Sequence, residues 1–204
     1  MRPALDLGFV ALVDAAPLII AKARGEFETE GLDVSLRREV SWATIRDKVA
    51  AGVHQGGHML APLAIATSVG AGAEPAALIA PMSLNAHGSS SGVSAALASE
   101  MRQLTAKGLA TAVAARRVAG RPAISFAVAF PYSAHNYMLR FWAASAGMDP
   151  DRDIRITVAA PATIAARHSI RQTPAIVLQV SELTAECADG RPIRGQGACC
   201  GASP

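Results

Sequence analysis

Two short segments place an aromatic or imidazole ring at the start of an expected helix, a combination suited to binding an anion. Trp42 follows the expected strand 32–40 and precedes a helix with a Ser or Thr cap. His135 and Asn136 lie in the first turn of another expected helix, directly after a strand. A helix N-terminus presents free N–H groups and a positive dipole end, and an imidazole can donate a charge-assisted hydrogen bond. Both segments are therefore candidate anion sites.

The same residues also have structural interpretations, which remain open at this point. Trp42 can close the edge of a sheet, and His135 can be a surface or capping residue; spacing alone favours both of these readings. A third segment, 85–91, combines an amide, Gly88 and three serines that begin at Ser89. Such residues can form a polar nest for oxygen ligands, but the composition is equally typical of a linker.

The sequence contains no pattern that predicts catalysis or metal binding. It lacks the GxSxG, P-loop and GxGxxG motifs. His54 and His58 flank two glycines, but no third ligand accompanies them at metal spacing. The cysteines, Cys187, Cys199 and Cys200, form no CxxC pair. We therefore predict a binding protein that is not an enzyme, with no metal and no cofactor.

Composition limits the remaining classes. The 204 residues are 51% hydrophobic with a formal charge of +3, enough for one substantial domain or two small lobes. Lys and Arg are dispersed, which argues against direct nucleic-acid binding. No apolar run reaches the length of a membrane span. Asp6 and Asp14 interrupt the segment where a signal peptide would be continuous, so the sequence as written predicts a cytoplasmic protein. A mis-assigned start would instead allow a periplasmic or membrane-associated one.

Strands that alternate with helices predict an α/β fold with a mostly parallel sheet. In such a sheet, the segments after the carboxyl ends of the strands face the ligand crevice, which is where Trp42 and His135 fall. The helical stretch 93–120 is expected to break near Gly108, and Asp189–Pro204 is expected to be poorly ordered. The expected strands are 5–12, 32–40, 56–60, 76–84, 123–130 and 153–160.

Four blocks in sequence order resemble the nitrate- and bicarbonate-binding proteins, which are solute-binding subunits of ABC uptake systems, and the related cytoplasmic nitrate/nitrite sensors. The blocks are LGFVALVDAAPLIIAKARGEFETEGLDVSL, SWATIRDKVAAG, HMLAPLAIATSVG and FPYSAHNYMLRFWAASAGMDPDRDIRI. The resemblance runs from Leu5 to Val158.

The resemblance implies a type II periplasmic-binding-protein-like fold with two lobes, and a nitrate or nitrite ion in the cleft between them. Lobe one would span 1–83 and a partial lobe two 84–160, with an atypical, poorly ordered tail at 161–204. By motif, Trp42 would be a flat wall for the anion and His135 a donor, with Asn136 beside it. The family tends to have an amide after Gly88, where this chain has Ser89.

The resemblance also implies a partner: an ABC permease for an uptake subunit, or an RNA-binding antiterminator for a sensor. Family members are longer, and a basic residue that helps to hold the anion lies in the part without a counterpart here. The change in pattern near 160–168 resembles a truncated or frameshifted product, which would bind nitrate weakly or not at all. Restoring the reading frame there should recover a family-like continuation. The alternatives are a non-functional fragment and a thiamine-pyrimidine-synthase-like enzyme on the same fold.

Overall fold

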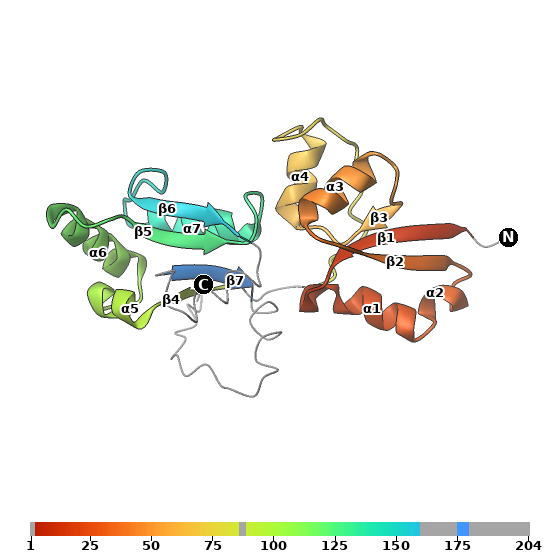
Figure 1. Ribbon diagram of the computed structural model, residues 1–204, viewed down its shortest axis with the longest axis horizontal. Helices are drawn as coiled ribbons and strands as arrows, with labels where there is room; N and C mark the ends of the chain where they lie inside the picture. Colours follow the sequence, from red (N-terminus) through yellow and green to blue (C-terminus); the bar gives the residue numbers. More distant parts are fainter. Residues whose placement is uncertain (1–2, 86–88, 160–174, 180–204) are drawn as a thin grey trace. The chain divides into compact units, whose positions relative to one another are not determined.

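The computed structural model describes residues 3–85, 89–159 and 175–179, which belong to two compact units (Figure 1). Unit 1 is Met1–His87 and unit 2 is Gly88–Pro204. Each unit contains one β-sheet.

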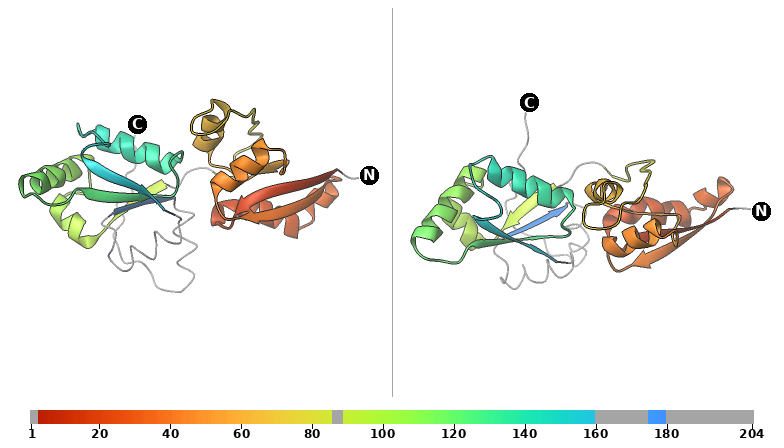
Figure 2. Two further views of the ribbon diagram at one scale, coloured as in Figure 1. Left: turned by 45° about the horizontal axis from the view of Figure 1, so that its top comes forward. Right: turned by 90° about the horizontal axis from the view of Figure 1, so that it is seen from above.

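The sheet of unit 1 is parallel, with strand order β2-β1-β3. β1 pairs with β2 along its whole length, from Ala4 opposite Asp33 to Val10 opposite Glu39. Helices α1 and α2 lie on one face of the sheet and α3 on the other (Figures 1 and 2). The elements of unit 1 are β1 (Ala4–Val10), a 3-10 turn η1 (Val13–Ala15), α1 (Ala16–Ala23), α2 (Glu26–Thr29), β2 (Asp33–Glu39), α3 (Trp42–Ala50), β3 (Gly56–Gly57) and α4 (Ala61–Ser68).

Unit 2 has a four-stranded sheet of order β4-β7-β5-β6, in which β4 is antiparallel to β7 and the other pairs are parallel. Its core is a cluster of buried apolar side chains from the helices and from β5 and β6, including Leu109, Phe126 and Leu139. The elements of unit 2 are β4 (Ser89–Val93), α5 (Ala95–Met101), α6 (Ala106–Val118), β5 (Ile124–Val128), α7 (Ala134–Ala144), β6 (Ile154–Val158) and β7 (Ala175–Gln179).

The long helical stretch of unit 2 breaks near Gly108, as expected, between Met101 and Ala106. α5 ends at Met101, Arg102 adopts a φ of 59°, and the Thr105 hydroxyl caps α6 by accepting a hydrogen bond from the Gly108 N–H. Gly108 is instead needed for the close packing of α6 against the turn before it. A Cβ at this position would lie 2.1 Å from the carbonyl oxygen of Gln103, so only glycine lets α6 approach the preceding turn.

Two segments differ from the elements expected of the sequence. Residues 76–84 form no strand, although their apolar run predicts one: the segment pairs with no other described strand, and Ile79 is 91% exposed. A strand needs a neighbouring backbone to satisfy its N–H and C=O groups, and hydropathy does not reveal whether one is present. Conversely, β7 lies within 161–204, where no element is expected. The remainder of that segment, including Asp189–Pro204, lies outside the described residues.

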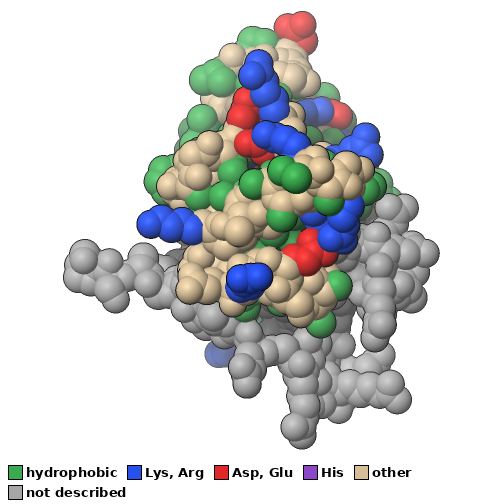
Figure 3. Space-filling model, turned by 90° about the vertical axis from the view of Figure 1, so that its left-hand side faces the viewer, with side chains coloured by type: hydrophobic (Ala, Val, Ile, Leu, Met, Phe, Trp, Pro, Cys, Tyr) green, Lys and Arg blue, Asp and Glu red, His purple; other side chains and the backbone are tan. Residues whose placement is uncertain are grey.

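Basic side chains on the helical face of unit 2 lie among acidic and apolar ones (Figure 3). Several of them are paired: Arg116 and Arg121 both contact Glu100, and Arg117 contacts Asp153. Arg116 lowers the pKa of Glu100 most strongly, by hydrogen bonding its carboxylate. No helix in the described part of the chain is long and apolar enough to cross a membrane.

Candidate functional site

Trp42 is the first residue of α3 and follows the carboxyl end of β2. Ser41 caps the helix, with its hydroxyl accepting a hydrogen bond of 3.2 Å from the Thr44 N–H. The indole is only 2% exposed, yet its Nε1–H has no hydrogen-bond partner in the described part of the chain. A buried donor without an acceptor costs about 1–3 kcal/mol, so the position is not explained by packing alone. It is a candidate for binding a hydrogen-bond acceptor.

Asp14 and His58 form a second polar group at the same end of the sheet. Asp14 lies in η1 after β1, and His58 follows β3. With Trp42 after β2, each of the three strands has one of these residues after its carboxyl end. The Nε2 atom of His58 lies 3.2 Å from an Asp14 carboxylate oxygen. The imidazole also meets the Trp42 ring edge to face, with centroids 6.4 Å apart and planes at 67°.

The amide of Asn85 connects the end of unit 1 to this region, because its Nδ2 donates to the Asp14 carbonyl at 2.9 Å. We name Asp14, Trp42 and His58 the edge cluster. From the sequence, Trp42 is selected as a candidate site residue. His58 is considered there only as a metal ligand and Asp14 only as an interruption of a signal peptide. The rule that ligands bind at strand carboxyl ends would have selected Asp14, which follows the expected strand 5–12. It would not have selected His58, which lies within the expected strand 56–60, whereas β3 ends at Gly57.

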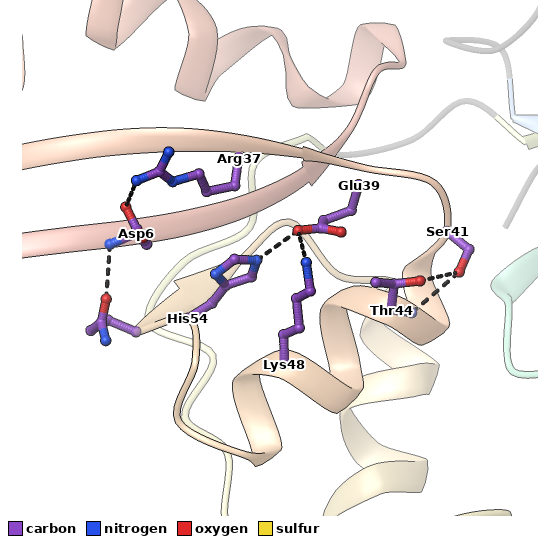
Figure 4. Close-up of polar contacts among 8 residues, drawn as sticks. Asp6, Arg37, Glu39, Ser41, Thr44, Lys48 and His54 are labelled. Carbon is purple, nitrogen blue, oxygen red and sulfur yellow. Dashed lines mark hydrogen bonds and ion pairs between the residues drawn. The ribbon is translucent and has the colours of Figure 1, made fainter.

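A partly buried ionic network fixes the start of α3, the helix that carries Trp42 (Figure 4). Glu39, the last residue of β2, accepts hydrogen bonds from Lys48 Nζ at 2.7 Å and from His54 Nε2 at 2.8 Å. Lys48 lies in the last turn of α3 and His54 in the loop before β3. Gly8 makes room for the imidazole, because a Cβ there would lie 2.9 Å from His54 Cδ2. The network therefore joins strand, helix and loop around the start of α3.

Replacing Glu39 with glutamine is expected to destabilise unit 1 at pH 7, and the loss is expected to shrink in acid. The hydrogen bond from Lys48, and then that from His54, lower the pKa of Glu39 below its ordinary value of 4.5. A carboxylate with a depressed pKa contributes stability that is complete above the unfolded-state pKa and is lost as pH falls through the folded-state pKa. Urea midpoints of wild type and Glu39→Gln should thus differ at neutral pH and converge well below pH 4.5.

Glu26→Gln is the matched control for this measurement. Glu26 pairs with Arg24 at 3.0 Å on the surface, where both side chains are more than half exposed. Exposed pairs of this kind contribute less than about 1 kcal/mol, so the control should unfold like wild type at every pH. A Glu39→Gln deficit of constant size from neutral to acid pH would contradict the assigned role of the carboxylate.

In unit 2, His135 and Asn136 occupy the first turn of α7, directly after β5. Ser133 caps the helix: its hydroxyl accepts from the Asn136 N–H at 3.2 Å and donates to the Phe130 carbonyl at 2.7 Å. The His135 side chain is buried, with 1% exposed. The Asn136 amide donates to the Pro131 carbonyl at 2.7 Å and accepts from Arg140 Nε at 3.2 Å. Asn136 therefore also fixes the loop that precedes the helix.

The remaining predicted residues lie at the beginning of unit 2. Ser89 is the first residue of β4 and pairs with Gln179 of β7. Gly88 lies outside the described residues. The structure thus groups His135 and Asn136 on one helix turn, and it places Trp42 in the other unit. Across residues 3–85, 89–159 and 175–179, no three His, Cys, Asp or Glu side chains gather as a metal-ion site.

Comparison with known proteins shows the family and the fold of this chain. The chain belongs to the NMT1-like family, whose profile matches residues 2–179, beyond the Val158 at which the resemblance in sequence blocks stops. It is 33% identical over 165 residues to the nitrate/nitrite binding protein NrtA of Synechococcus elongatus, covering 77% of this chain and 37% of that protein. It is 32% identical to the bicarbonate-binding protein CmpA of the same organism, covering 74% and 35%.

Solved structures show the same fold. The periplasmic nitrate-binding protein NrtA from Synechocystis PCC 6803 superposes with a TM-score of 0.73 at 27% identity, over 87% of this chain and 47% of that one. The aliphatic sulphonate binding protein SsuA from Escherichia coli matches with a TM-score of 0.61 at 15% identity, over 93% and 58%, which shows the fold alone. The type II periplasmic-binding-like α/β fold is confirmed. The chain spans little more than a third of the length of its curated binding-protein relatives.

Proposed function

We propose that this chain is a solute-binding protein that binds a small planar oxyanion, nitrate or nitrite, and is not an enzyme. The observation that carries the proposal is the buried indole of Trp42, whose Nε1–H has no partner among the described residues. It lies at the carboxyl end of a parallel sheet and at a helix N-terminus, the place where α/β folds bind anions.

Nitrate suits this site for chemical reasons. It is a planar monoanion with weak acceptor oxygens, so several donors and a flat apolar face hold it better than one strong base. Trp42 provides the face and one donor. In the proposed complex, His135 and the helix N-termini provide further donors, with Ser89 in place of the amide that the family tends to have.

The proposed role is in import, as opposed to cytoplasmic sensing. The chain is 32% identical over 157 residues to part of a protein of Synechocystis named nitrate import ATP-binding protein NrtC, covering 22% of that protein. The binding proteins described above are likewise named for nitrate or bicarbonate. We therefore propose an ABC permease complex as the partner, which favours a periplasmic location over the cytoplasmic one predicted from the start of the sequence.

The two tryptophans allow a direct test, since Trp42 lies in unit 1 and Trp142 in unit 2. In a ¹H–¹⁵N spectrum of the ¹⁵N-labelled chain, each indole N–H gives one resolved peak, assigned by the Trp142→Phe variant. We expect sodium nitrate or nitrite to shift the Trp42 peak saturably, more strongly than bicarbonate does. Sodium chloride at equal ionic strength should leave it in place. A Trp42 peak unmoved by all three oxyanions would overturn the proposal.

A further inference from the structure

His58 is held by a buried carboxylate on one side of its ring. Its Nε2 lies 3.2 Å from Asp14 Oδ2, and the two side chains are 5% and 3% exposed. Since an ionised carboxylate only accepts hydrogen bonds, Nε2 carries a proton and donates it to Asp14. That contact fixes the orientation of the imidazole and leaves Nδ1 as the atom available for another partner.

Two ring nitrogens of the edge cluster are buried without a hydrogen-bond partner in the described part of the chain: His58 Nδ1 and Trp42 Nε1. Their rings are in contact, with centroids 6.4 Å apart. Each buried, unsatisfied polar atom costs about 1–3 kcal/mol, and that cost is recovered when a ligand supplies the missing partner. An oxyanion presents several acceptor oxygens within a small volume, so one ion can satisfy both nitrogens.

We propose that His58 is a second ligand-contacting residue of unit 1, with Nδ1 donating to the oxyanion that also accepts from Trp42 Nε1. Asp14 is then a positioning residue, which acts through the imidazole. This inference rests on the proposed function. Because nitrate carries acceptors only, both nitrogens of His58 hold a proton in the complex. Carboxylate, imidazolium and oxyanion then alternate in charge. Glu39 and Lys48, a further charged pair of unit 1, neutralise each other.

Two substitutions separate the roles of the two ring nitrogens. In His58→Gln the side-chain amide nitrogen falls near the position of Nε2, so the Asp14 contact is kept and the Nδ1 contact is lost. In His58→Asn the amide nitrogen falls near the position of Nδ1, so the opposite holds. Both are made in the full 204-residue chain. Nitrate affinity is measured from the Trp42 indole peak, and stability of unit 1 from Trp42 fluorescence in urea with Trp142→Phe as background.

If Nδ1 contacts the anion, His58→Gln should raise the Kd for nitrate about tenfold or more, as expected for loss of a hydrogen bond to a charged group, with little change in urea midpoint. His58→Asn should raise the Kd clearly less than His58→Gln does, because only the positioning by Asp14 is lost, and it should lower the midpoint, because Asp14 loses its partner. The reverse pattern, with affinity lost in His58→Asn and kept in His58→Gln, would show that only the Asp14 contact matters and would overturn the inference.

A measurement on the wild type reports the Nδ1 contact directly, without a change in affinity or stability as an intermediate. Long-range ¹H–¹⁵N spectra resolve the two nitrogens of each imidazole, and His58 is assigned by its absence in His58→Gln. Nitrate should move the Nδ1 resonance of His58 toward the protonated position, and an Nδ1 resonance that stays in place while the Trp42 peak saturates overturns the inference alone. If neither resonance responds to nitrate, nitrite or bicarbonate, the proposed function fails, and the role of His58 fails with it.

Discussion

Trp42→Ala is expected to abolish nitrate binding and to lower the unfolding free energy of unit 1 by about 3–5 kcal/mol. The side chain is 2% exposed, so truncation leaves a large cavity between α3 and the end of the sheet. It also removes the flat face and the N–H donor in one step. Loss of binding in this variant alone would therefore not distinguish a ligand contact from a local collapse.

Trp42→Phe separates the two effects. The phenyl ring retains a flat apolar face but has no donor, so the affinity for nitrate should fall by about tenfold or more. The stability of the free protein should change much less than in Trp42→Ala. Removal of an unsatisfied buried N–H is favourable, and it offsets part of the cost of the smaller ring. Isothermal titration calorimetry measures the affinity, and urea unfolding followed by circular dichroism measures the stability.

Trp142→Phe is the matched control, because Trp142 packs against the core of unit 2, far in sequence from the edge cluster. It should leave the nitrate affinity unchanged. Wild-type affinity in Trp42→Phe would contradict the assignment of the indole N–H to the anion, and the structural interpretation of Trp42 would then stand.

Gly108→Ala is expected to destabilise unit 2 by about 2 kcal/mol or more, although alanine is the better helix former. Within a helix this exchange normally gains at most about 1 kcal/mol. Here the new Cβ would lie 2.1 Å from the carbonyl oxygen of Gln103 and 2.8 Å from that of Met101. These are backbone atoms of a tight turn, so they cannot rotate away as a side chain would, and the steric cost exceeds the gain.

Thr111→Ala tests the same helix without the clash. Thr111 is exposed one turn further along α6, where its hydroxyl donates to the Lys107 carbonyl at 3.0 Å. Its replacement should change the stability by less than about 0.5 kcal/mol. Trp142 fluorescence in a Trp42→Phe background reports the urea unfolding of unit 2 for both variants. A Gly108→Ala protein as stable as the control would show that the backbone at Gln103 shifts to accommodate the new Cβ, which would contradict this prediction.

Individual helices and strands could largely be predicted from the sequence, because each depends mainly on the residues within it. Alternation over 32–40 predicts β2 within one residue at each end, and the Ser-capped start of α3 places Trp42 correctly at a strand-to-helix junction. The general rule for parallel sheets then indicates that Trp42 lies at a ligand-binding edge.

Which of these elements lie next to one another could not be predicted in the same way. Asp14 and His58 meet only because β3 pairs with β1, and no local pattern encodes that pairing. For the same reason, the apolar run 76–84 was wrongly predicted as a strand, while AIVLQ, equally apolar, forms β7. Which of two similar segments becomes a strand depends on whether a neighbouring strand is available, which is a long-range property.

The position of β7 in the sheet has a consequence for synthesis on the ribosome. β7 lies between β4 and β5, although it follows both of them in the chain. The sheet of unit 2 therefore cannot form completely until residues 175–179 have left the ribosome. Until then, β4 lacks the strand with which it pairs. The described strands of unit 1 all precede residue 58, so that sheet can form earlier during translation. Shortening the chain before β7 should therefore harm unit 2 and spare unit 1.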